Sequence, residues 1–200
     1  MKIYTIPAGV LRANSYLLTK DGESGVLIDC GGPEPVAFAT EKKIKIEYVL
    51  LTHGHFDHIG GCAAARRAGA KIGCSEKERT LVFSAANLAG ISGVRVPDFA
   101  IDFTFRGGDC LSLCGMDFQV IETPGHTPGG ACFLAENALF TGDTLFCRSV
   151  GRTDFPGGDA GALRESLRTL FALSGDPDVY PGHDEQTSLE EERLHNPYAM

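Results

Sequence analysis

The segment from Thr52 to Gly61 constrains this chain more than any other, because it places three histidines and an aspartate within six residues. It directly follows an apolar run, residues 48–51. Neutral imidazole binds zinc, iron and copper well, and a carboxylate adds charge for a second cation. The glycines of the segment let the backbone turn tightly enough for neighbouring side chains to converge. The pattern therefore predicts a metal site at a strand end, in preference to a polar loop whose histidines face water.

Length and charge narrow the class of protein. A chain of 200 residues allows one domain with a sizeable core. The net charge of −8 argues against a broad phosphate-binding surface, so we expect no nucleic-acid partner. Residues 1–7 lack the apolar block of a signal peptide, and no stretch is long enough to span a bilayer. Seven cysteines without a Cys-x-x-Cys pair are expected to be buried thiols in a reducing cytosol, which predicts a cytoplasmic location and no membrane association.

Short apolar runs separated by turn residues predict an N-terminal antiparallel meander at residues 3–6, 15–18 and 26–28. The third run ends at Asp29, just before two glycines. Two interpretations of Asp29 stay open at this stage. Its side chain forms the turn, or its carboxylate accepts hydrogen bonds that brace the histidine loop from behind the metal ligands.

Helices and a further strand are predicted next. An extended pattern at residues 44–51 leads into the histidine loop, and helical patterns cover residues 35–40, 61–68, 160–173 and 188–195. The sequence from Ser75 to Glu78 matches a capping box, which predicts a helix running to about Leu88. Residues 89–100 show no period and are expected to form a surface excursion that shapes substrate entry.

A second meander is predicted from residue 103 to residue 121, followed by strands at 131–134, 138–141 and 178–180. The tripeptide Pro-Gly-His occurs twice after a short apolar strand, ending in His126 and in His183. In each copy the proline ends the ladder, the glycine turns, and the imidazole emerges at the edge of the sheet. Two meanders with associated helices predict an α/β fold, a four-layer αββα sandwich in which residues 1–200 form a single domain.

The candidate ligands all follow strands or lie beside glycines: His53, His55, Asp57, His58, His126, Asp143 and His183. One tetrahedral ion rarely needs seven ligands. Two ions a few Å apart do, each held by about three protein groups while sharing one carboxylate and one solvent molecule. The residues therefore predict two divalent metal ions as cofactors.

The histidine loop, the later histidine, the aspartate and the final histidine follow one another in the order found in the metallo-β-lactamase superfamily. The chain resembles that superfamily over essentially its whole length. The resemblance implies that His53, His55 and His126 bind a first ion. It implies that Asp57, His58 and His183 bind a second, and that Asp143 bridges both ions together with a hydroxide. Asp57 and Asp143 are then residues of the catalytic centre. Zinc is the expected metal, with iron and manganese as alternatives.

Within that superfamily the chain resembles the short bacterial form of glyoxalase II (hydroxyacylglutathione hydrolase). Residues 142–146, the run 149–159 and the ending 192–198 carry this resemblance. Full-length members continue past the Asn-Pro-aromatic motif into basic residues that hold glutathione, whereas this sequence stops soon after it. Arg152 stands where the family places a basic substrate contact. We expect it either to bind an anionic group of the substrate or to pair with Asp154 or Asp159.

The function implied by the resemblance is hydrolysis of small-molecule thioesters such as S-lactoylglutathione by a metal-bridging hydroxide. Metal binding lowers the pKa of water to about 7, and a thiolate with a pKa of about 8.5 leaves with little acid assistance. The nearest alternative is a persulfide dioxygenase that uses one iron, and the intact set Asp57, His58 and His183 argues for two metals instead. A lactonase, a β-lactamase and a non-catalytic metal-binding module are further alternatives. The sequence carries no prediction of oligomeric state.

Overall fold

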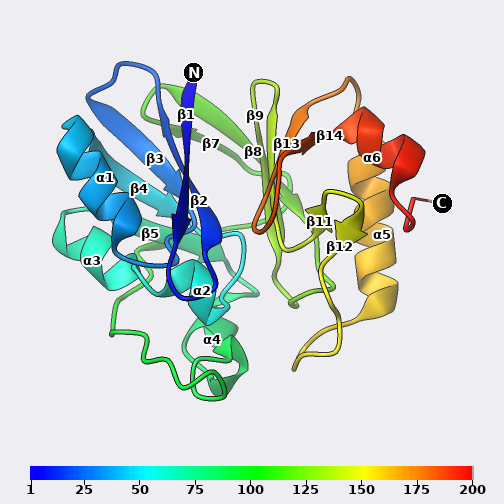
Figure 1. Cartoon of the computed structure of the whole chain (residues 1–200), viewed down its shortest axis with the longest axis horizontal. Coiled ribbons are helices and arrows are strands. Elements are labelled where there is room, and N and C mark those ends of the chain that lie inside the picture. Colours follow the sequence, from blue (N-terminus) through cyan, green and yellow to red (C-terminus); the bar gives the residue numbers. More distant parts are fainter. Residues whose placement is uncertain (200) are drawn as a thin grey trace.

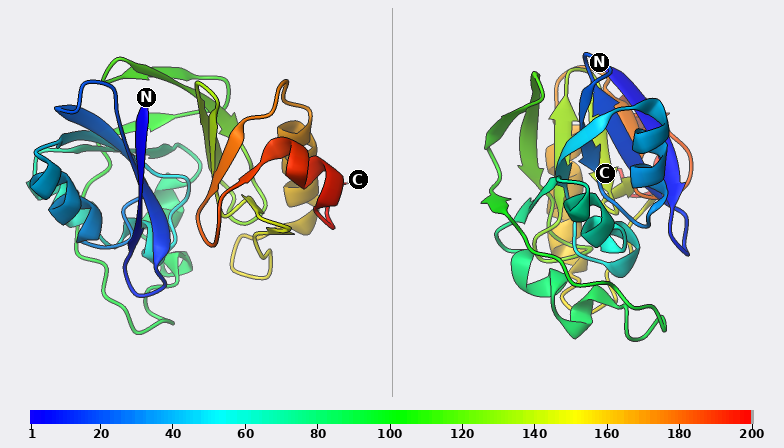
Figure 2. Two further views of the ribbon diagram at one scale, coloured as in Figure 1. Left: turned by 45° about the horizontal axis from the view of Figure 1, so that its top comes forward. Right: turned by 90° about the vertical axis from the view of Figure 1, so that its left-hand side faces the viewer.

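The structure is a computed structural model that describes residues 1–199. Two six-stranded sheets pack face to face, and helices cover their outer faces (Figure 1). Helices α1 (Glu34–Lys42) and α3 (Cys62–Arg67) lie against the first sheet, and helices α5 (Ala160–Phe171) and α6 (Leu189–His195) against the second. The left view of Figure 2 shows the N-terminal half of the chain on one side and the C-terminal half on the other. The predicted αββα sandwich in a single domain is confirmed.

The first sheet has the order β1-β2-β3-β4-β5-β6. Its strands are β1 (Lys2–Ala8), β2 (Ala13–Thr19), β3 (Ser24–Ile28), β4 (Lys45–Leu50), β5 (Lys71–Ser75) and β6 (Phe103–Phe105). The first three pair antiparallel, as the sequence predicts, and the later pairs are parallel. Parallel neighbours need a crossover: α1 lies in the crossover from β3 to β4, α3 in that from β4 to β5, and residues 76–102 connect β5 to β6.

The second sheet has the order β14-β13-β10-β9-β8-β7. Its strands are β7 (Cys110–Leu113), β8 (Met116–Glu122), β9 (Ala131–Ala135), β10 (Ala138–Gly142), β13 (Asp178–Pro181) and β14 (Thr187–Ser188). A small hairpin of β11 (Leu145–Phe146) and β12 (Ser149–Val150) stands beside it. We expected the second meander to begin at residue 103. Strand β6 instead pairs with β5 in the first sheet, where the Asp102 carboxylate accepts a hydrogen bond from the Ile72 N–H at 2.9 Å.

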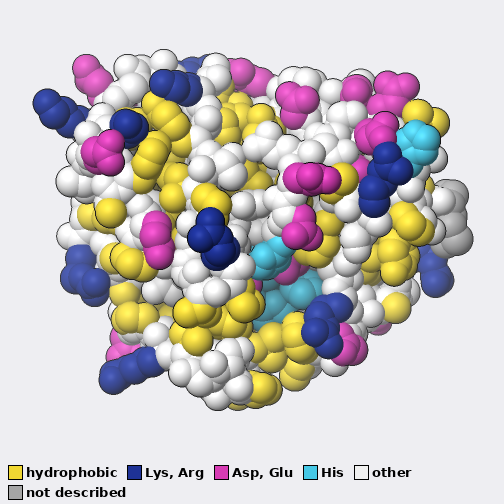
Figure 3. All heavy atoms as spheres, in the orientation of Figure 1, with side chains coloured by type: hydrophobic (Ala, Val, Ile, Leu, Met, Phe, Trp, Pro, Cys, Tyr) yellow, Lys and Arg dark blue, Asp and Glu magenta, His cyan; other side chains and the backbone are white. Residues whose placement is uncertain are grey.

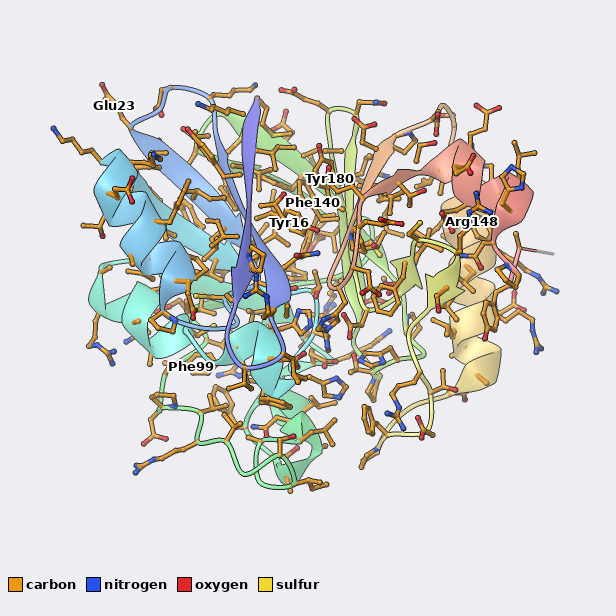
Figure 4. The ribbon with its side chains drawn as sticks, viewed as in Figure 1. Tyr16, Glu23, Phe99, Phe140, Arg148 and Tyr180 are labelled. Carbon is orange, nitrogen blue, oxygen red and sulfur yellow. The ribbon has the colours of Figure 1, made fainter. Side chains whose placement is uncertain are left out.

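The core consists of three apolar layers, one between the sheets and one beneath the helices of each side. Successive side chains of a strand point to opposite faces of the sheet, so each strand contributes side chains to two layers. In β2, Tyr16 lies between the sheets and Leu17 faces the helices of the first side. Tyr16 meets Phe140 and Tyr180 across the sheet interface, with ring centroids 5.3 and 5.4 Å away (Figure 4). Burial on both faces explains the unbroken apolar runs that predicted these strands.

The predicted helix from Ser75 to Leu88 is wrong. The chain forms a one-turn helix, α4 (Arg79–Val82), and a 3₁₀ turn, η1 (Ala85–Asn87). Glu78 does not cap this helix, because its fully buried carboxylate accepts hydrogen bonds from two distant loops. Residues 89–100 contain no helix or strand, as predicted.

The cysteines correct a second expectation. Four are buried, Cys114 and Cys147 are half-buried, and Cys110 is exposed at the start of the edge strand β7. Alternate side chains of an edge strand face solvent, so an apolar run does not guarantee burial there. None of the cysteines within residues 1–199 forms a disulfide. Within the same residues no helix has the length and apolar character needed to cross a membrane.

Candidate metal centre

The seven predicted ligand residues meet at one edge of the sandwich, where β4, β8, β10 and β13 end. The loop after β4 and the one-turn helix α2 (Phe56–Ile59) supply four of them, and each of the other three strands supplies one in the loop that follows it or at its end. In the second sheet β10 and β13 run parallel to each other. Strands β8 and β10 both run antiparallel to β9, which lies between them, so the carboxyl ends of β8, β10 and β13 lie on the same side. Figure 3 shows the histidine side chains in a hollow bordered by hydrophobic side chains.

His53, His55 and His126 form a first triad. Each offers one ring nitrogen, and these nitrogens lie within 4.8 Å of one another. The Nε2 atom of His126 is 2.9 Å from the Nδ1 atom of His55. All three side chains are buried. Three imidazole nitrogens directed at one point form a site suited to zinc or another divalent transition metal.

Asp57, His58 and His183 form a second triad, again with ligand atoms within 4.8 Å of one another. The Asp57 Oδ2 atom lies 3.2 Å from His183 Nε2 and 3.7 Å from His58 Nε2. His58 is fully buried, whereas the His183 side chain keeps 24% of its surface exposed. The second triad is therefore the one that opens to solvent.

The carboxylate of Asp143 lies between the two triads. Its Oδ1 atom is 3.3 Å from His58 Nε2 in the second triad, and its Oδ2 atom is 3.5 Å from His126 Nε2 in the first. Oδ2 is also 3.6 Å from His183 Nε2. A side chain at Gly182 would collide with the Asp143 carboxylate, so the glycine of the second Pro-Gly-His is needed to let the strands approach. The carboxylate stands where a group shared by two cations would stand.

Hydrogen bonds fix which ring nitrogens are free. The Nδ1 atom of His126 donates to the carbonyl oxygen of Arg152 at 2.7 Å, and Nδ1 of His58 donates to the Asp29 carboxylate at 2.8 Å. Both partners only accept, so Nδ1 of each ring carries a proton and Nε2 is the ring nitrogen that faces the cluster. This arrangement is typical of metal-ligating histidines.

Four polar atoms of the cluster are buried without a hydrogen-bond partner: His53 Nε2, His55 Nε2, His58 Nε2 and Asp143 Oδ1. A buried polar group left unsatisfied costs about 1–3 kcal/mol, so native proteins rarely keep several together. Coordination of cations would satisfy the ring and carboxylate atoms that point into the cluster. The donor set therefore fits divalent metal ions, and the ligand role of each residue stays a prediction.

The two triads differ electrostatically. Burial, together with the neighbouring His126 ring, lowers the pKa of His55 to about 3, and burial lowers that of His53 well below its ordinary value. Burial alone would also lower the pKa of His58, but the carboxylates of Asp143 and Asp57 outweigh it and raise that pKa well above its usual range. His53 and His55 of the first triad are therefore neutral imidazoles. The second holds a proton among its carboxylates, which a cation would displace on binding.

Asp29 binds a ligand of the second triad directly and reaches a ligand of the first triad through Thr52. Its Oδ1 atom accepts the Thr52 N–H at 2.8 Å, and its Oδ2 atom accepts the Thr52 hydroxyl at 2.7 Å as well as the His58 ring. The Thr52 oxygen in turn lies 3.1 Å from Nδ1 of His53. Asp29 has a φ of 56°, a left-handed conformation that aspartate tolerates better than most residues. Asp29 therefore both forms the turn and accepts hydrogen bonds from the histidine loop. Its effect on metal binding stays a prediction.

The side chains that hold the segment around His183 are not evident from the sequence. The Asn14 side chain donates to the carbonyl oxygens of Pro181 and Asp184 at 3.1 and 3.0 Å, and the Tyr16 hydroxyl donates to that of Pro181 at 2.5 Å. Both donors come from β2 in the opposite sheet. The available signal was the presence of polar side chains inside a strand whose residues are all buried.

A cavity of about 690 Å³ opens over the cluster. Most of its wall surface is apolar, and the apolar side chains that line it are Leu11, Phe56, Leu88, Ile91, Phe146, Val150 and Phe155. Leu11 and Ile91 are 55% and 82% exposed, which is unusual for large apolar side chains beside a polar cluster. Ile91 belongs to the excursion that we expected to shape substrate entry.

The predicted substrate residue Arg152 lies at the rim of this cavity. Its guanidinium forms two hydrogen bonds of 2.6 Å with the Asp154 carboxylate and lies 4.1 Å from the centre of the Phe155 ring. The pairing with Asp154 that we weighed as an alternative is therefore present. More than half of the side-chain surface is exposed, and binding of substrate by Arg152 stays a prediction.

Comparison with known sequences gives two findings. Residues 8–183 match the family model of the metallo-beta-lactamase superfamily. The hydroxyacylglutathione hydrolase GloC of Haemophilus influenzae is 35% identical over 207 aligned residues, which cover 99% of this chain and 98% of that protein.

Solved structures agree with the sequence matches. The crystal structure of the BLEG-1 B3 metallo-beta-lactamase superposes with a TM-score of 0.92 at 32% identity, covering 99% of both chains. TTHA1623 in a di-iron-bound form superposes with a TM-score of 0.87 at 34% identity, covering 98% of this chain and 99% of that one.

Proposed function

Because the chain belongs to the metallo-beta-lactamase superfamily, whose members are mostly hydrolases, we propose that it hydrolyses small-molecule thioesters at a centre of two divalent metal ions. The observation that carries this proposal is the position of Asp143, whose two carboxylate oxygens face different triads. A single cation would leave the second triad, which contacts the same carboxylate, without a ligand role.

Support for two cations comes from the cluster and from one relative. Each triad supplies three ligand atoms, and Asp143 can serve both. TTHA1623, which matches this chain over nearly its full length, is described in a di-iron-bound form. We propose zinc for this chain because imidazole-rich sites suit it, with iron and manganese as alternatives. When bound, the two ions would supply a hydroxide at neutral pH and polarise the carbonyl group of the substrate.

The protein's own groups would orient the substrate. The apolar cavity walls exclude water from the reacting carbonyl and suit an acyl group with apolar surface. Arg152 at the rim is the group available for a carboxylate of the thiol half, once it exchanges Asp154 for the substrate. Asp57 and Asp143 would hold the cations and offset part of their positive charge.

The match to a hydroxyacylglutathione hydrolase over nearly all of both chains supports S-lactoylglutathione and related acyl thioesters as the substrate class. We propose that the protein is cytoplasmic. The cysteines within residues 1–199 are all free thiols, and free thiols persist in reducing compartments. The partner is then a small molecule and neither nucleic acid nor membrane.

One observation favours a second candidate. The histidine triad alone is a complete three-ligand site, so one iron bound there could support a persulfide dioxygenase. A single panel of assays separates the two: hydrolysis of S-lactoylglutathione and of simple acyl thioesters, beside oxygen uptake with a persulfide. We expect thioester hydrolysis without oxygen uptake. Oxygen uptake by an iron-loaded protein that leaves every thioester intact would replace our proposal with the dioxygenase.

A further inference from the structure

Glu78 is a buried carboxylate that serves neither a helix cap nor an ion pair. Its side chain is completely excluded from solvent. Its Oε1 atom accepts the backbone N–H of Gly54 at 2.9 Å, and its Oε2 atom accepts the backbone N–H of Gly129 at 2.8 Å. Gly54 separates His53 from His55, and Gly129 lies three residues after His126.

The two glycines belong to different halves of the sandwich. Gly54 lies in the loop after β4 of the first sheet, and Gly129 lies in the loop between β8 and β9 of the second. One carboxylate therefore joins the two loops that carry the whole first triad. A second link is the backbone hydrogen bond of 2.9 Å that Ala131, the first residue of β9, donates to Thr52 in the loop after β4. The Glu78 carboxylate and this hydrogen bond thus connect the two halves of the sandwich at two points near the first triad.

Both loops pack tightly against the segment from Glu78 to Val82. A Cβ atom at Gly129 would overlap the backbone of Glu78 and approach its Oε2 atom to 2.7 Å. A Cβ atom at Gly54 would approach the Val82 side chain to 2.8 Å. Both loops thus contact the segment from Glu78 to Val82 as closely as backbone can, and glycine is the residue that permits it.

A carboxylate is expensive to bury without a partner cation, and charge-assisted hydrogen bonds to backbone N–H groups offset that cost. Both oxygens of Glu78 bind the histidine-bearing loops, so displacing either loop would strand a buried charge. The carboxylate therefore restrains the loops strongly in one relative position. Ligands held to within about 0.5 Å are what a metal site requires for affinity.

We propose that Glu78 is a positioning residue that sets the separation of His55 and His126 and thereby the affinity of the histidine triad for its metal. The inference rests on the proposed metal centre but not on the thioester substrate. A glutamine at position 78 keeps the shape and one acceptor, but it presents an NH₂ group to one of the two N–H donors. One loop then loses its hydrogen bond.

The test compares Glu78→Gln with wild type and with Glu76→Gln as a matched control. Glu76 lies two residues away, is exposed, and pairs with Arg106. Metal-free protein is titrated with cobalt(II), and the visible spectrum and the competition with a chelator report each bound equivalent. We expect Glu78→Gln to weaken one of two equivalents by about 10- to 100-fold and to shift its absorption bands. Glu76→Gln should match wild type.

A second variant keeps the proposal testable if substitution of Glu78 prevents folding. Gly129→Ala retains the carboxylate but pushes the loop away from it, and we expect the same equivalent to weaken. Wild-type affinity and spectrum for both equivalents in Glu78→Gln would overturn the inference, because the hydrogen bonds would then only stabilise the fold. Since cobalt binding is read without any substrate, failure of the thioester assay leaves this result interpretable.

Discussion

The Nδ1 atom of His58 lies 2.8 Å from the Oδ2 atom of Asp29, and both side chains are buried. The contact turns the free Nε2 of His58 toward the carboxylates of Asp57 and Asp143. Through Thr52 the same aspartate also reaches His53. One residue after β3 therefore orients a ligand in each triad, which is the outer-shell role that typically tunes metal affinity.

Asp29→Asn should weaken metal binding about 10- to 100-fold. The NH₂ group of asparagine cannot accept a hydrogen bond, so the bond from either the Thr52 N–H or the His58 ring is lost. Asparagine tolerates the left-handed backbone, so the turn is retained. Asp29→Ala should weaken binding over the same range but also strain that turn. Chelator competition measures the change, with Asp117→Asn in the exposed β7–β8 hairpin as control. Unchanged affinity in Asp29→Asn would leave Asp29 as a turn former only.

Asp143→Ala should lose more than half of the bound metal and nearly all hydrolysis. Two cations a few Å apart repel strongly, and the carboxylate between the triads is the anion that offsets the repulsion. Elemental analysis of the purified variant, beside a thioester assay, measures both effects. A variant with two ions per chain and near-wild-type turnover would show that no shared ligand is needed.

Arg152→Ala should raise the KM for S-lactoylglutathione while kcat changes little, the pattern expected when binding is lost equally from the ground state and the transition state. Asp154→Ala is the matched variant, because it releases the Arg152 guanidinium from its hydrogen bonds without removing it. That variant should lower the KM. If both variants keep the wild-type KM, the arginine serves only its ion pair at the surface.

Ile91→Ser should reduce kcat/KM for thioesters with longer apolar acyl chains, by about 10-fold, and leave acetyl thioesters little affected. The side chain is 82% exposed at the cavity wall, so its loss should not unfold the protein. Leu194→Ser, equally a surface change but on α6, is the control. Steady-state kinetics on an acyl series with one constant thiol measures the ratio. A ratio unchanged from wild type would mean that the acyl group does not contact Ile91.

Much of this fold could be predicted because each sheet is covered on both faces. Strands such as β2 and β10 are buried throughout, so each contains a short apolar run, residues 16–18 in β2 and 138–140 in β10. The seven clustered residues were found for the same reason, since each follows such a run. Their meeting point at one edge depends on the directions of the strands and on the packing of the two sheets.

The parts that could not be predicted depend on contacts distant in sequence. Ser75 and Glu78 carry a pattern that describes a local cap, but the glutamate binds Gly54 and Gly129, which are 24 and 51 residues away. Helix α2, with four residues inside the histidine loop, is too short for a periodic signal. Asn14 donates to a carbonyl 167 residues away, and a local pattern holds no information about such a partner.

The central claim is that two bound ions are needed to hydrolyse a thioester. Metal-free protein titrated with zinc, with hydrolysis of S-lactoylglutathione or an acyl thioester followed at each addition, tests it most directly. The account predicts that activity rises until two equivalents per chain are bound and that Asp143→Ala never reaches this level. Full hydrolytic activity at one equivalent would contradict it, as would protein that binds two equivalents and cleaves no thioester.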